Sequence, residues 1–346
     1  MCRLGLPVPP AFALPIGLCD QYARQGELPS SMWPEVRRHL HFLEREVRRS
    51  FADPTRPLLV SVRSGARKSM PGMLDTLLNV EIPDSARGSL AGLQLAIEQV
   101  IDSWSGERAR AYRRWAGIGD SGGTAVIVQA MVLGNRGGDS GVGVATVAKG
   151  CVRGEWLQGE QGDVLMTGAA SPASLGELAL SLPATHRELS RMSRRLEEEL
   201  GEAVEVEFTV EEGRLFLLQV RAVEAEADPR PPLVEEGSRG GEGVLLSGVP
   251  ASPGIASGTA TASLGDSGEG GPVVLVREST APADVPAMLE SVAVVTARGG
   301  FTSHAAVICR EAGIPCVVGC GAGALALLDR QVTVNGSTGD IAGGRA

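Results

Sequence analysis

A stretch rich in proline, glycine and glutamate, Ala225–Gly243, divides this chain of 346 residues into two parts. Its sequence, AEADPRPPLVEEGSRGGEG, has few apolar residues to bury, and proline and glycine interrupt helices and strands. Apolar runs lie on both sides of it. The sequence therefore predicts two domains, residues 1–224 and residues 244–346, joined by a flexible linker at residues 225–243.

The first part alternates helical and strand patterns. Apolar residues at helical spacing predict a helix over Met32–Arg49, and further helix candidates are Leu90–Trp104 and Arg108–Trp115. Short β-branched runs predict strands at Pro57–Val62 and Gly123–Val132. We therefore expect a fold of the α/β (α+β) class.

The second part has several short apolar runs and one short helical pattern. Its predicted strands are Pro272–Val276, Val292–Thr296, Cys316–Gly319 and Gln331–Asn335. The predicted helix covers Ala305–Glu311, because Gly313 and Pro315 after it are stop signals. This pattern predicts a compact β/β/α domain.

Composition excludes several classes of partner. The net charge of −9 comes without a basic tract, which argues against a nucleic-acid or anionic-membrane surface but allows a nucleotide. The six cysteines form no C-x-x-C pair and no zinc set. No stretch approaches a membrane span, and the N-terminus lacks the pattern of a signal peptide. We therefore expect a cytoplasmic protein with reduced thiols.

A histidine directly follows a loop of two glycines and two hydroxyl residues, in the sequence GGFTSHAA at residues 299–306. His304 would lie in the first helical turn, where unpaired N–H groups and the helix dipole favour a phosphate. Because a neutral imidazole is nucleophilic near neutral pH, His304 is a candidate phosphoryl acceptor. Spacing alone leaves a capping or surface histidine as the alternative.

The predicted strand Pro57–Val62 leads into a basic loop, RSGARKSMPG, which opens with Arg63 and Ser64. Its glycines allow close backbone approach and its cations neutralise charge, so the loop suits a polyphosphate. An ordinary basic turn is the alternative.

The segment EVEFTVEEGRLFLLQVR, at residues 205–221, predicts two short strands joined by a tight turn. Alternation places Glu205 and Glu207 on one face, and Gln219 and Arg221 share a face on the return strand. Paired carboxylates at this spacing can hold Mg²⁺ while phosphates supply the other oxygens. The polar outer face of a hairpin is the alternative.

These motifs together resemble one enzyme family. GGFTSHAA followed by GIPCVVG is similar to the phosphohistidine signature of the phosphoenolpyruvate-utilising enzymes, and its T-S-H-A-A form is most similar to the pyruvate, phosphate dikinase family. VSVRSGARKSMPGMLDTLLN, GEWLQGEQGDV and the hairpin resemble the nucleotide-binding half of that family, in the same order. The resemblance implies a partial ATP-grasp domain followed by a swivelling phosphohistidine domain.

The resemblance also implies roles for individual residues. His304 would carry the phosphoryl group, and Arg63 would offset developing charge during the transfer. The implied nucleotide- and phosphate-binding residues are Arg63, Ser64, Gln161, Gln219, Arg221, Gly299, Gly300, Thr302 and Ser303. Glu205 and Glu207 would bind Mg²⁺, and ATP and inorganic phosphate would be substrates. Thr302 and Ser303 are expected to cap the helix, and Thr302 aligns with the family's position for regulatory phosphorylation.

The chain departs from the family pattern in three ways. The family's first strand and its Gly-Lys-Gly segment are not found in the sequence. At Asn79–Ala86 the chain lacks the residues that form a helical subdomain in the family. The R-N-P segment expected after Val144 is also missing. A pyruvate- and phosphoenolpyruvate-binding TIM barrel does not follow.

The resemblance therefore implies an ATP- and phosphate-dependent phosphorylation of His304, followed by transfer to an acceptor. In the family the acceptor is pyruvate, and here a separate barrel protein would have to supply its site. One alternative is a non-catalytic nucleotide-binding or regulatory remnant. A further alternative is a relative that phosphorylates an antibiotic or makes phosphoenolpyruvate from ATP and water.

Overall fold

The computed structural model of the chain describes residues 1–53, 55, 57–68, 70, 72–81, 90–119, 122–162, 164, 172–223, 243–263 and 271–344. The chain forms two compact units, one of Val8–Val132 and the other of Met1–Pro7 together with Leu133–Ala346. The predicted linker lies outside the described residues except for Gly243, so its flexibility and the domain boundaries that it sets stay predictions.

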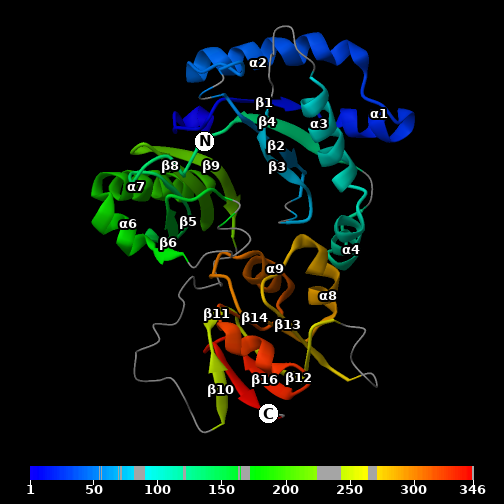
Figure 1. The fold of residues 1–346 in the computed structure, drawn as a ribbon, viewed down its shortest axis with the longest axis vertical. Helices are drawn as coiled ribbons and strands as arrows, with labels where there is room; N and C mark the ends of the chain where they lie inside the picture. The colour runs from blue at the N-terminus through cyan, green and yellow to red at the C-terminus, as the bar shows by residue number, and fades with distance from the viewer. Residues whose placement is uncertain are drawn as a thin grey trace. The chain divides into compact units, whose positions relative to one another are not determined.

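The unit Val8–Val132 is built on a four-stranded antiparallel sheet (Figure 1). Its strands, in sheet order, are β1 (Ala11–Leu14), β4 (Ala125–Ala130), β2 (Val60–Gly65) and β3 (Thr76–Val80). Its described helices are α1 (Gly17–Gln25), α2 (Trp33–Val47), α3 (Ala91–Ser103) and α4 (Glu107–Trp115). The helices and strands predicted for this part are confirmed to within a few residues.

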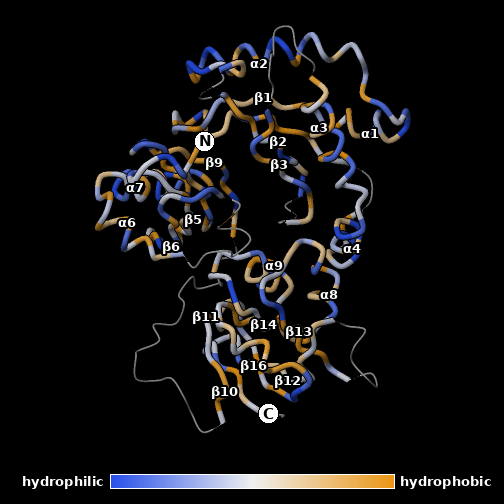
Figure 2. The backbone as a smooth tube through the Cα atoms, in the orientation of Figure 1, coloured by the Kyte–Doolittle hydropathy of each residue, from blue (hydrophilic) through white to orange (hydrophobic). Residues whose placement is uncertain are grey.

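Helix α2 shows how the sequence dictates this packing. Val36, Leu40 and Leu43 recur at helical spacing and are at most 1% exposed. They join Val60 and Val62 of β2 in one apolar cluster. Figure 2 shows hydrophilic residues along α2 and predominantly hydrophobic strands. The amphipathic pattern therefore fixes which face of α2 the sheet covers.

Strand β2 extends beyond its predicted end. The apolar run stops at Val62, but Arg63, Ser64 and Gly65 continue the ladder with three residues of β4. Backbone pairing needs no apolar side chain, so hydropathy did not predict these last positions. Arg63 and Ser64 are therefore strand residues rather than members of the predicted basic loop.

The other unit contains two sheets. The first is antiparallel and has five strands, which in sheet order are β7 (Ala173–Ser174), β6 (Cys151–Gln158), β5 (Gly141–Ala148), β8 (Val204–Glu211) and β9 (Arg214–Ala222). The helices that pack against it are α6 (Leu175–Ser181) and α7 (Pro183–Leu200) (Figure 1). The predicted hairpin is confirmed by β8 and β9, which pair directly.

The second sheet of this unit has eight strands and carries the predicted phosphohistidine segment. Its strands, in sheet order, are β10 (Val244–Ser247), β17 (Asp340–Gly343), β16 (Gln331–Asn335), β12 (Ile255–Thr261), β13 (Val273–Arg277), β14 (Ala293–Thr296), β15 (Cys316–Val318) and β11 (Val249–Ser252). Strands β12 to β15 run parallel, and helix α9 (His304–Ala312) connects β14 to β15. Helix α8 (Val285–Glu290) precedes β14. The predicted strands and helix of this part are confirmed.

Short 3₁₀ turns complete the described structure, at Cys2–Leu4, Ser30–Met32, Pro282–Asp284 and Ala322–Leu327. None of the helices in the described ranges is both long and apolar enough to cross a bilayer. The cytoplasmic location stays a prediction.

Candidate functional site

His304 is the first residue of helix α9. Ser303 occupies the N-cap position with an extended backbone (φ −62°, ψ 157°), and Gly313, in the left-handed region, ends the helix. His304 is buried, with 7% of its surface exposed. The predicted position in the first turn is therefore confirmed, and the interpretation as a surface histidine is wrong.

The loop before His304, residues 299–303, binds a carboxylate; we call it the His loop. The N–H of Phe301 donates to Glu155 Oε1 at 2.8 Å, and the N–H of Thr302 donates to Glu155 Oε2 at 3.0 Å. The Thr302 hydroxyl donates to the same Oε2. These donors lie in the loop just before the N-cap Ser303, near the positive end of the α9 dipole, and hydrogen bonds from backbone N–H groups to a charged carboxylate are strong.

Glycine makes room for this contact. A Cβ at Gly300 would lie 2.6 Å from Glu155 Oε1 and 2.9 Å from Pro172 Cγ, closer than real Cβ atoms approach. Gly299 has a φ of 113°, in the region that favours glycine. The two glycines predicted to border a phosphate therefore shape the His loop around an anionic group.

The hydroxyl groups of the His loop differ from the prediction. Ser303 makes no side-chain capping bond, and its Oγ is buried without a hydrogen-bond partner in the part of the chain that the structure describes. Thr302 donates to Glu155 instead of capping α9. A buried hydroxyl without a partner is costly, so Ser303 is suited to donate to an oxyanion beside His304.

Arg310, two turns along α9, fixes the His loop from within the domain. Its Nη1 donates to the Phe301 carbonyl at 2.7 Å and to the Ala251 carbonyl at 3.2 Å. Its guanidinium carbon lies 4.1 Å from the centre of the Phe301 ring, a cation–π contact. These contacts hold the backbone that carries the loop's N–H donors.

The second group of predicted residues lies on the β8–β9 hairpin, and strand register brings it together. Glu205 lies opposite Arg221, and Glu207 lies opposite Gln219; we call these four residues the hairpin face. Arg221 Nε donates to Glu205 Oε1 at 2.7 Å, with the two side chains 15% and 9% exposed. This pair is therefore largely shielded from solvent, whereas Gln219 is exposed and Glu207 half-buried, so the interpretation as a polar outer face still fits part of the hairpin face.

Arg221 also reaches helix α9. Its Nη1 donates to Glu311 Oε1 at 3.2 Å. Burial works to lower the pKa of the Arg221 guanidinium, but the charge and hydrogen bond of Glu205 and the charges of Glu311 and Glu207 raise it. Arg221 therefore keeps its positive charge in a setting with three carboxylates.

Arg310 links the His loop with the hairpin face electrostatically. Burial lowers its pKa, the charge of Glu205 raises it, the charge of Arg221 lowers it, and that of Glu155 raises it. The hydrogen bonds from Arg221 to Glu311 of α9, and from the His loop to Glu155 of β6, place the predicted phosphate-binding residues of the hairpin and of the His loop in contacting parts of this unit.

The hairpin face contains two carboxylates that can bind Mg²⁺ together with the phosphates of a substrate. Glu205 and Glu207 leave the same face of β8, and the bond from Arg221 uses only Oε1 of Glu205. Mg²⁺ is usually held by one or two carboxylates plus substrate phosphates, which these two residues would satisfy. Within the described ranges, no cluster of three His, Cys, Asp or Glu side chains could hold a metal ion by itself. The assignment of Glu205 and Glu207 to Mg²⁺ stays a prediction.

The remaining predicted ligands are placed as follows. Arg63 and Ser64 are half-buried on β2 of the unit Val8–Val132. Gln161 follows β6, and its Oε1 accepts the N–H of Gly134 at 3.2 Å, so its amide supports a loop of its own unit. The nucleotide-binding roles of these three residues stay predictions.

Three charged residues of the site were not predicted: Glu155, Arg310 and Glu311. Glu155 and Thr302 are separated by 147 positions, and Arg221 and Glu311 by 90. Glu155 belongs to the GEWLQGEQGDV segment, which carried part of the resemblance, but no local pattern pairs it with the His loop.

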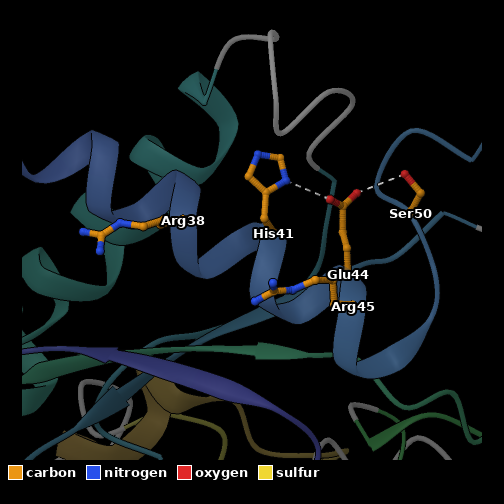
Figure 3. A pocket seen from close by; sticks show the side chains of 5 residues that line it. All are labelled: Arg38, His41, Glu44, Arg45 and Ser50. Carbon is orange, nitrogen blue, oxygen red and sulfur yellow. Dashed lines mark hydrogen bonds and ion pairs between the residues drawn. The ribbon is translucent and has the colours of Figure 1, made fainter.

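A surface hollow of about 440 Å³ on α2 is lined by Arg38, His41, Glu44, Arg45 and Ser50 (Figure 3). Figure 3 shows Glu44 between His41 and Ser50, to which it is hydrogen-bonded. None of the predicted site residues lines this hollow. It is therefore a charged helix surface and not part of the candidate site.

Two segments of the chain match models of known protein families. Residues 19–162 match the AMP/ATP-binding domain of pyruvate phosphate dikinase, and residues 270–339 match the mobile domain of PEP-utilising enzymes. The first segment includes Arg63, Ser64 and Gln161, and the second includes the His loop and His304.

Curated relatives agree. The chloroplastic pyruvate, phosphate dikinase of Flaveria pringlei is 30% identical, in a match that covers 99% of this chain and 50% of that protein. Pyruvate, phosphate dikinase of Giardia intestinalis is 31% identical over 99% of this chain and 54% of the relative. The chain thus spans about half the length of the curated relatives it matches. The first match runs over 475 positions although the chain has 346 residues, so the relative has residues within this span that the chain does not.

The two matched segments are thus a nucleotide-binding domain and, after it, the mobile domain of PEP-utilising enzymes. The chain belongs to the pyruvate, phosphate dikinase family, of which it carries the AMP/ATP-binding domain and the mobile domain.

Proposed function

We propose that this chain is a phosphotransferase that moves a phosphoryl group from ATP to His304, with inorganic phosphate as a co-substrate. The observation that carries the proposal is the His loop, which binds a carboxylate through two backbone N–H groups and a hydroxyl next to a buried histidine. Hydrogen-bond donors that bind one oxyanion are also suited to bind the oxygens of a phosphoryl group.

The chemistry assigns each group a task. A ring nitrogen of neutral His304 attacks the β-phosphorus, a P–N bond forms, and the P–O bond to the α-phosphate breaks, so that AMP leaves. Inorganic phosphate then attacks the outer phosphorus of the pyrophosphoryl group on His304, the P–O bond between its two phosphorus atoms breaks, and pyrophosphate leaves. One phosphoryl group stays on His304. Ser303 and the His-loop N–H groups hold the phosphoryl oxygens. Arg221 and Gln219 hold the triphosphate from the hairpin face, and Arg63 and Ser64 contribute to the nucleotide site.

Mg²⁺, held by Glu205 and Glu207 together with the phosphates, would neutralise charge on the triphosphate. For the final acceptor we propose pyruvate, which the names of the relatives contain. We also propose the cytoplasm as the compartment.

The test is chemical labelling. The chain is incubated with ATP radiolabelled at the β-phosphate, Mg²⁺ and inorganic phosphate, and the modified residue is located by mass spectrometry. The label should be stable in base and lost in acid, as a phosphoramidate is and a serine or threonine ester is not. His304→Ala should abolish the label, whereas His186→Ala on α7 should not change it.

Other outcomes would separate the alternatives. Labelling confined to Thr302 would contradict phosphoryl transfer to His304. Binding of Mg-ATP without any label would instead support the non-catalytic nucleotide-binding module. Calorimetry with Mg-ATP on the same samples distinguishes the two outcomes.

A further inference from the structure

This unit contains the five-stranded and the eight-stranded sheet, and a predicted phosphate-binding group lies in the part of the unit that each sheet builds. Each group is hydrogen-bonded to a carboxylate from the other part. On the hairpin face, Arg221 of β9 donates to Glu311 of α9 at 3.2 Å. In the His loop, the N–H groups of Phe301 and Thr302 donate to Glu155 of β6. The donors that would bind phosphate are therefore the donors that hold α9 to the five-stranded sheet.

We propose that Glu311 is an internal competitor of the nucleotide: its ion pair with Arg221 holds α9 against the hairpin face, and a triphosphate bound at Arg221 weakens that contact. This inference rests on the proposed function, because it takes Arg221 as a phosphate ligand. It adds a residue, Glu311, and a coupling between nucleotide binding and the helix that begins with His304.

Electrostatics gives the reason for competition. A guanidinium has five N–H donors, and Glu205 and Glu311 each receive a bond from Arg221. A polyphosphate at the remaining donors would place several negative charges beside the Glu311 carboxylate. Like charges at close range repel, and they do so more strongly where water is partly excluded. Arg221 is 15% exposed and Glu311 is 27% exposed, so solvent screens the repulsion only in part.

Glu205 does not compete in the same way. It lies on β8, directly opposite Arg221 in the same hairpin, so its pairing orients the guanidinium whether or not α9 is in contact. Glu311 belongs to α9, in the part of the unit built by the eight-stranded sheet. Of the two carboxylates bonded to Arg221, Glu311 is therefore the one that can separate from it. Linkage is reciprocal: if the α9 contact weakens nucleotide binding by some factor, bound nucleotide weakens the α9 contact by the same factor.

The test compares Mg-ATP affinity by calorimetry in the full chain with four variants. Glu311→Gln keeps the size of the side chain and removes its charge. We expect it to bind Mg-ATP about threefold to tenfold more tightly, the range expected for loss of one partly screened ion pair. Glu290→Gln on α8 is the matched control, because it removes one exposed negative charge from the same domain. Thermal unfolding of each variant verifies that it is folded.

A double-mutant cycle shows whether the effect passes through Arg221. In an Arg221→Gln background, adding Glu311→Gln should give no further gain in affinity. A gain that persists in that background, or one equal to that of Glu290→Gln, would reflect net charge alone and overturn the inference while the proposed function stands. Unchanged affinity in Glu311→Gln would also overturn it. If the wild-type chain binds no Mg-ATP, the proposed nucleotide site fails and the inference fails with it.

Discussion

At the scale of single residues, the site consists of groups that sequence patterns can find and groups that they cannot. His304, its two glycines and the four residues of the hairpin face were predicted from short motifs and strand alternation together with the family resemblance that these motifs carry. Glu155 and Glu311 were not, because their partners lie 147 and 90 positions away and no short-range period connects them. The same long-range contact explains why the hydroxyl of Thr302 donates to Glu155 instead of capping α9.

Gly300 provides a residue-scale prediction. Its φ is not in the left-handed region, so Gly300→Ala adds a Cβ without backbone strain but places it 2.6 Å from Glu155 Oε1. The carboxylate must move away, and the amides of Phe301 and Thr302 lose their acceptor. We expect their hydrogen exchange to accelerate about tenfold or more, and stability to fall by about 1–2 kcal/mol.

Gly271→Ala is the matched control, because a Cβ there meets no atom within 4 Å. Exchange rates at Phe301 and Thr302 that match the control would show that Glu155 does not protect these amides.

At the scale of elements, the fold followed from periodicity, and the ends of elements did not. The apolar spacing of α2 predicted which face is buried, but β2 runs to Gly65 because backbone pairing with β4 continues after the apolar side chains end. The end of α2 shows a similar limit. Arg48 closes it with φ 53° in place of the glycine that commonly stands there, and Glu44 accepts hydrogen bonds from residues beyond it.

Glu44 makes the stability of this helix end depend on pH. Burial works to raise the pKa of its carboxyl, but hydrogen bonds from the Phe51 N–H, Ser50 and His41 outweigh it and lower the pKa below 4.5. The folded-state pKa thus lies below the unfolded value. The stabilisation is therefore present above about pH 4.5 and is lost as pH falls through the lower, folded-state pKa.

Glu44→Gln should lower the free energy of unfolding by about 1 kcal/mol near pH 7, since hydrogen bonds to a charged acceptor are weakened. The difference from wild type should shrink as the pH falls below about 4.5 and through the lowered, folded-state pKa of Glu44. Urea unfolding across this pH range measures it. Glu46→Gln, an exposed position on the same helix, should show little change at any pH; an equal loss there would attribute the effect to helix charge in general.

At the scale of the whole molecule, the sequence predicted a nucleotide-binding part and a mobile part, and the comparisons matched family models to both. The sequence did not predict which compact unit contains the first residues of the chain. Met1–Pro7 belong to the same compact unit as Leu133–Ala346, while Val8–Val132 form the other. A linear pattern search assigns neighbouring residues to one domain, so it misses a terminal segment that packs with residues far along the chain.

This division predicts the effect of a substitution at Leu6. Leu6 is 7% exposed and joins the apolar cluster of the five-stranded sheet, which includes Phe208 and Leu215, and the Leu217 N–H donates to the Pro7 carbonyl. Leu6→Ala should cost about 2–3 kcal/mol, the lower part of the range for a buried leucine. The loss should accelerate hydrogen exchange in β8 and β9. Leu14→Ala, at 8% exposure in the cluster of the unit Val8–Val132, should accelerate exchange in β1 and β4 instead. If Leu6→Ala raised exchange mainly in β1 and β4, the N-terminal segment would belong to that unit.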